Sequence, residues 1–146
     1  MGALLHPVTA AATCQSVIIS EVQRMDFATL ETSSSPKDIT VNYDGSGYTG
    51  SGVVLIGSPS RGGYQLVGDP TCTVSLDIEN ISTGSANVTL DSFKGSYQNL
   101  TINSFPSSVL PAPGAGSVLY LGAKMTYQNV PEGPISPTFD LVVNYQ

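Results

Sequence analysis

The stretch TFDLVVNYQ, residues 138–146, decides the fold of this chain of 146 residues. Apolar or aromatic side chains stand at every second position, and mostly polar ones stand between them: Phe139, Leu141, Val143 and Tyr145 form the apolar set. Because successive side chains of a strand point to opposite faces, this pattern predicts a strand with one buried face. A strand so apolar needs hydrogen-bonding neighbours along both edges, and no hairpin partner follows it in the sequence. We therefore expect another segment to cover its free edge.

The rest of the chain repeats this period of two. Residues 71–79 alternate between Cys72, Val74, Leu76 or Ile78 and polar side chains, and residues 117–128 place Leu119, Leu121, Ala123, Met125 and Tyr127 on one face. Ile39, Val41 and Tyr43 are expected to be buried, and Leu100 and Ile102 are expected to point inward. VVLI, residues 53–56, is apolar on both faces, which predicts a central strand. No stretch carries an apolar stripe of helical period.

Composition indicates a single domain of strands and turns. The chain is 40% hydrophobic and only 11% charged, with 15 Gly and 10 Pro. Gly and Pro are residues of turns, and a chain of this length can bury one core. About nine or ten short strands separated by polar turns predict an all-β, immunoglobulin-like sandwich with Greek-key connections.

The net charge argues against two classes of partner. The chain carries −6 at neutral pH, with five Lys and Arg in total. Nucleic acids and anionic membrane surfaces are bound through clustered cations, so neither is an expected partner. The sequence has no run of 18 or more apolar residues, so we expect no membrane insertion.

Cys14 and Cys72 are the two cysteines of the chain. Both stand in segments that alternate like strands, so the two side chains could meet across a sheet. The alternative is a pair of buried free thiols in a cytosolic protein. We expect a disulfide, because low charge and abundant Thr and Asn suit an exported protein.

Residues 1–13 precede the predicted sandwich, which spans residues 14–146. Ala10 and Ala12 form an A-x-A pattern of the kind found before a signal-peptidase cut, although the preceding apolar stretch is short. The segment is therefore either a signal-peptide remnant or an arm of the mature protein.

The titratable residues indicate no catalytic or metal site. The one histidine, His6, precedes Pro7 in the N-terminal segment, outside the predicted core, and the chain has three Cys and His residues in all. Nucleophilic catalysis and zinc binding both need such groups clustered. The eleven acidic residues are spread along solvent faces. We therefore expect no enzyme, no cofactor and no metal.

Two segments carry a resemblance to a known family. MDFATLE, residues 25–31, resembles the L-D-F-G element that follows the first strand in secreted bacterial domains related to spore coat protein U and to chaperone–usher pilus subunits; Ala28 occupies the position of the glycine. YLGAKMTY, residues 120–127, with TFDLVVNYQ resembles the paired strands near the end of those domains.

The resemblance implies an immunoglobulin-like sandwich that lacks its final strand. The groove beside the last strand, with Phe139, Leu141, Val143 and Tyr145 as acceptor residues, would then be filled by a neighbour's N-terminal arm. In one register Leu4, Val8, Ala10 and Ala12 of the arm point together as candidate donor residues.

Such contacts imply a structural, adhesive subunit of a secreted bacterial surface filament. Its partners would be identical subunits, with a periplasmic chaperone and usher during assembly. The alternative is a self-complete, monomeric surface or coat domain.

Overall fold

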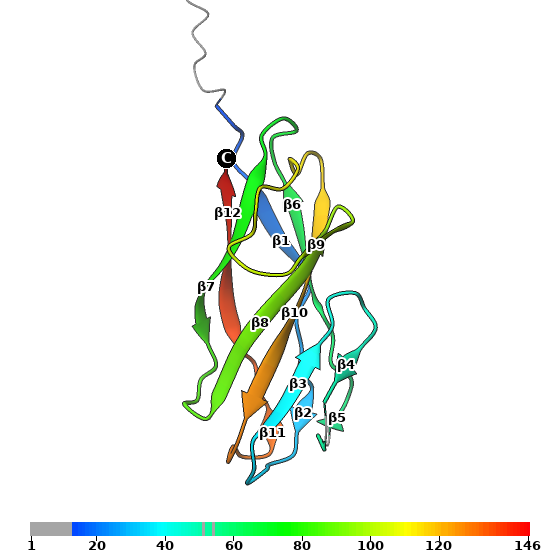
Figure 1. The fold of residues 1–146 in the computed structure, drawn as a ribbon, viewed down its shortest axis with the longest axis vertical. Helices are drawn as coiled ribbons and strands as arrows, with labels where there is room; N and C mark the ends of the chain where they lie inside the picture. The colour runs from blue at the N-terminus through cyan, green and yellow to red at the C-terminus, as the bar shows by residue number, and fades with distance from the viewer. Residues whose placement is uncertain (1–12, 51, 54) are drawn as a thin grey trace, which may run out of the picture.

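A computed structural model describes residues 13–50, 52–53 and 55–146, and these residues contain strands but no helix (Figure 1). The strands are β1 (Ile18–Gln23), β2 (Thr29–Leu30), β3 (Lys37–Val41), β4 (Tyr48–Thr49), β5 (Leu55–Ile56), β6 (Gly62–Val67), β7 (Val74–Ser82), β8 (Val88–Tyr97), β9 (Leu100–Ile102), β10 (Ser117–Tyr127), β11 (Gly133–Pro134) and β12 (Thr138–Tyr145). The predicted all-β class is confirmed.

The larger sheet is organised around β10. The first half of β10 pairs with β6, its second half pairs with β3, and its other edge pairs with β8. β1, β4 and β9 extend the sheet at its margins. Gly122 lies where β6 gives way to β3, and a Cβ atom there would stand 2.1 Å from the Val41 carbonyl oxygen. Only glycine permits this close approach of two backbones.

The second layer of the sandwich consists of the β7–β12 pair and the short sheet β11-β2-β5. Val74 and Leu76 of β7 are fully buried and belong to the same core as Leu119 and Leu121 of β10. One apolar core therefore joins the two layers, as expected of a sandwich.

The predicted alternation is confirmed in the two strands that mattered most. All five predicted apolar positions of β10 are buried. In β12, Phe139, Leu141, Val143 and Tyr145 are half-buried and pack against the core, whereas Thr138, Asp140 and Asn144 are exposed.

The prediction of a central strand at residues 53–56 is wrong. The strand β5 is two residues long and stands at the margin of its sheet, and Ile56 is 63% exposed. Gly52 and Gly57 flank this segment with φ of +67° and +94°, so the backbone turns away on both sides. Apolar runs predict burial but not the length of the extended backbone.

Ile102 and Leu100, which were both predicted to point inward, differ in burial. Ile102 is buried, as expected, but Leu100 is 44% exposed because β9 lies at the margin of the sheet. Tyr43 is half-buried and follows the end of β3.

Ala28 adopts a backbone conformation that favours glycine, with φ of +62°. The left-handed region costs a residue with a Cβ about 1–2 kcal/mol. Replacing Ala28 with glycine would remove this cost. It would also remove an almost buried methyl group, and that loss of burial offsets part of the stability gained. We expect Ala28→Gly to raise the free energy of unfolding by about 1 kcal/mol in urea titrations. Ala123→Gly, in the middle of β10, serves as the control and is expected to lower it. A loss of stability in Ala28→Gly would contradict the strain argument.

Candidate functional site

A groove with a volume of about 520 Å³ lies between β1 and β12. β1 stands at the margin of the larger sheet and β12 at the margin of the β7–β12 pair, so the groove opens between the two layers. The residues that line it are Ile19, Glu21, Arg24, Met25, Phe27, Tyr64, Leu90, Pro137, Thr138, Phe139, Asp140 and Leu141.

Each of the two walls of the groove has a strand edge that no other described strand pairs with. β12 pairs with β7, and no second strand among the described residues pairs with it. β1 pairs with β6 alone in the same part of the chain. All six residues of β1 are exposed, including Ile18 at 64% and Val22 at 57%. Each wall therefore presents backbone groups and apolar side chains that a further extended segment would cover.

An aromatic cluster forms the floor of the groove. The Phe139 ring packs edge-on against Phe93, with centroids 5.2 Å apart, and against Tyr64, with centroids 6.1 Å apart. Met25 and Phe27 lie beneath and are almost fully buried. Offset and edge-on ring packing is the favourable geometry, so Phe139 is held in place while still lining the cavity.

Polar groups lie around this apolar floor. Glu21, Arg24 and Asp140 are exposed residues that line the groove. Burial, followed by the nearby Glu21 carboxylate, raises the pKa of Tyr64 to about 12, while Arg24 acts in the opposite direction. The Tyr64 hydroxyl is therefore protonated and uncharged at neutral pH, so it adds a polar but neutral group to the groove.

The raised pKa of Tyr64 predicts loss of stability in alkali. An unfolded tyrosine ionises near pH 10, whereas Tyr64 resists ionisation until about 12 in the fold. Its contribution to stability is therefore complete below pH 10 and is lost as the pH rises to 12. We expect Tyr64→Phe to make the free energy of unfolding fall less steeply over this range in urea titrations. An unchanged pH profile in the variant would contradict this assignment.

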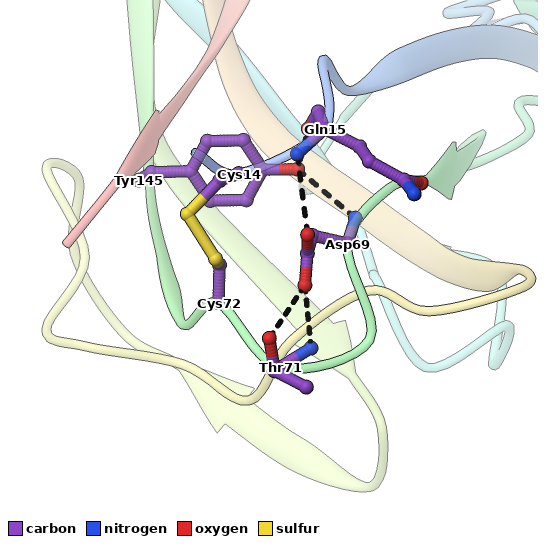
Figure 2. Close-up of a disulfide and its surroundings, with 6 residues drawn as sticks. All are labelled: Cys14, Gln15, Asp69, Thr71, Cys72 and Tyr145. Atoms are coloured by element: carbon purple, nitrogen blue, oxygen red, sulfur yellow. Dashed lines mark hydrogen bonds between the residues drawn. A yellow bond between two sulfur atoms is a disulfide. The ribbon is translucent and has the colours of Figure 1, made fainter. Parts of the chain in front are cut away.

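The end of the sandwich at which β12 finishes is tied together covalently and by hydrogen bonds (Figure 2). Cys14 and Cys72 form a disulfide. The Tyr145 hydroxyl donates to the Gln15 carbonyl oxygen and accepts from the Asp69 N–H at 3.1 Å. We call this end the C-terminal pole. The described chain begins there, beside the end of β12 (Figure 1).

Asp69 completes the C-terminal pole. Its carboxylate accepts from the Thr71 hydroxyl at 2.7 Å, from the Thr71 N–H at 2.8 Å and from the Gln15 N–H at 3.2 Å. These bonds, that of the Thr71 hydroxyl first, lower the pKa of Asp69. Gln15 and its neighbours are therefore fixed at the pole by main-chain and side-chain contacts as well as by the disulfide.

Two of the four residues predicted to accept a donor strand line the groove, and their acceptor role stays a prediction. The predicted disulfide is confirmed, and Phe139 and Leu141 line the groove, while Val143 and Tyr145 lie further along β12. The candidate donor residues, Leu4, Val8, Ala10 and Ala12, lie outside the described residues. Glu21, Tyr64 and Leu90 were not predicted as site residues. They belong to β1, β6 and β8, and no local signal in the sequence brings these three distant strands together.

The described residues contain no group of three or more His, Cys, Asp and Glu arranged to hold a metal ion. Nor does any helix among them have the length and apolarity needed to cross a membrane.

Comparison with known proteins assigns the domain to a family without assigning a function. Neither the curated proteins nor the solved structures contain a match. A family model described as "Domain of unknown function (DUF4402)" matches residues 17–145, from just before β1 to the end of β12. The chain therefore belongs to the DUF4402 family.

Proposed function

We propose that this domain is a structural subunit that accepts an extended segment of a neighbouring subunit between β1 and β12 and so assembles head to tail into an extracellular fibre. The observation that carries the proposal is the one-sided pairing of β12 beside a groove with an aromatic floor. An added strand would pair its backbone with the β12 edge and insert alternate side chains into the groove.

The proposed donor is the N-terminal arm, residues 1–13, of an identical subunit. In one register Leu4, Val8, Ala10 and Ala12 point together, as a strand in this groove requires. Its proposed direction follows from head-to-tail stacking of the subunits. A neighbour's arm leaves from that subunit's own pole and enters this groove at the opposite end, near Thr138, so it runs antiparallel to β12.

Such a contact joins two different surfaces and does not close on itself. Repetition of a heterologous contact produces an open filament. The role is mechanical and needs neither a catalytic group nor a cofactor. The disulfide fits an oxidising compartment, which supports secretion to the cell surface. The resemblance to pilus subunits supports the same role and adds a periplasmic chaperone and usher as proposed assembly partners.

The test compares the full chain with a variant that lacks residues 2–12. The full chain is expected to form multimers that resist sodium dodecyl sulfate and dissociate on heating, and the shortened variant to be monomeric and less stable. A synthetic arm peptide at 100 times its dissociation constant should restore about 2.7 kcal/mol to the shortened variant.

The matched control is the same peptide with Leu4 and Val8 replaced by aspartate, which should not bind. Multimers that persist after the deletion would contradict the proposal. A shortened variant of unchanged stability would favour the self-complete, monomeric surface domain instead.

A further inference from the structure

The start of the described chain is anchored at the opposite end of β12 from the groove. Gln15 is bound by Tyr145 and Asp69, and Cys14 by the disulfide to Cys72, all at the C-terminal pole. The groove is lined by residues 137–141, at the beginning of β12. Seven residue steps of β12 separate Thr138 from Tyr145, roughly 23 Å at about 3.3 Å per residue.

The arm has a bulky half and a small half. Residues 1–8 include Met1, Leu4, Leu5 and Val8, whereas residues 9–12 are Thr-Ala-Ala-Ala. The small half is the one next to the anchor. The half of the arm that meets the groove residues 137–141 therefore depends on the direction in which the arm enters.

The two directions give opposite pairings. A neighbour's arm enters at the Thr138 end and places its alanine segment, residues 10–12, over the aromatic floor. The subunit's own arm starts at the C-terminal pole and must first reverse direction. If residues 11–13 form the turn and residue 10 lies level with Tyr145, then Leu4 lies level with Phe139. The remaining ten residues extend roughly 33 Å, more than the distance required.

We infer that, in the unassembled subunit, the arm folds back into its own groove parallel to β12, with Leu4 and Leu5 at the Phe139 end. Assembly then replaces it with a neighbour's arm in the antiparallel direction. This inference rests on the proposed function and names the groove's first occupant. The large side chains match a cavity of about 520 Å³ better than alanine does. The resident arm competes with the incoming one, so self-occupancy delays polymerisation.

Cysteine pairs distinguish the two directions. Glu21 is an exposed residue that lines the groove, so Glu21→Cys provides the fixed partner. It is combined with Leu4→Cys in one variant and with Ala11→Cys in the matched control. Each variant is refolded at low concentration, oxidised mildly and mapped by mass spectrometry, with the native disulfide intact.

The Leu4→Cys/Glu21→Cys monomer is expected to form the engineered disulfide within one chain. The Ala11→Cys/Glu21→Cys monomer is expected to stay reduced at these positions and to form a disulfide only between chains after concentration. A reduced Leu4→Cys/Glu21→Cys monomer, or an intrachain disulfide in the control, would overturn the inference.

If multimers form but the Leu4→Cys/Glu21→Cys monomer stays reduced, this inference is wrong and the proposed fibre is unaffected. If the intrachain disulfide forms but no multimers appear, self-occupancy is supported and the proposed fibre is contradicted.

Discussion

Replacing both Cys14 and Cys72 with serine is expected to lower the free energy of unfolding by about 4 kcal/mol. The disulfide joins residues 58 positions apart, and closing a loop of that length removes conformational entropy from the unfolded chain. A domain of this size has about 5–15 kcal/mol in total. The midpoint of thermal unfolding should therefore fall by roughly 10–20 °C, as measured by circular dichroism.

Chemical reduction provides the control for this variant. The native protein in dithiothreitol should unfold at the same temperature as the double serine variant, and the variant itself should not respond to the reductant. A difference below about 1 kcal/mol between the variant and the native protein would contradict the entropic account. It would mean that the unfolded chain is already compact around these two residues.

Phe139→Ala is expected to have the largest effect on the groove. Its ring contacts both Phe93 and Tyr64, so truncation should cost about 3 kcal/mol of stability. Removal of the ring also takes away the floor on which the proposed arm packs. We expect the affinity for the arm peptide to fall by about 30-fold in calorimetric titrations, at a temperature where the variant is folded.

Val142→Ala is the matched control for Phe139→Ala. Val142 belongs to the same strand but points to the opposite face, where it lies across from Asp77 of β7. The control should lose less than about 1 kcal/mol and keep the affinity of the native groove. A Phe139→Ala variant that is destabilised yet binds the peptide normally would show that β12 is structural and that the peptide binds elsewhere.

Most of the fold could be predicted from side-chain patterns that repeat every two residues. In β10 and β12 an apolar side chain stands at every second position. These positions are buried in β10, and in β12 they are half-buried and packed against the core. A different signal, the apolar run at residues 53–56, was misleading. Apolarity on both faces indicates a central strand only when neighbours pair with both edges, whereas β5 is two residues long and stands at the margin of its sheet.

The groove could be predicted only along β12. Its opposite wall and floor come from β1, β6 and β8, which are separated from β12 by long stretches of sequence. Alternation shows which side of a strand is buried, but strand order depends on contacts between distant residues. Tyr64 and Leu90 therefore became recognisable as site residues only when the sheets were assembled. Ala28, in contrast, was marked by its place in the L-D-F-G-like element, and its positive φ explains why glycine suits that place.

The disulfide also determines how the domain would respond to mechanical force. A pull on the backbone at Thr13 reaches Cys14 and passes through the sulfur–sulfur bond to Cys72, next to the start of β7. β7 is hydrogen-bonded along its length to β12. In a fibre joined as proposed, tension would travel from arm to β7 to β12 and on to the next subunit. β1 to β6 would remain outside that path, so stretching the fibre would not require them to unravel.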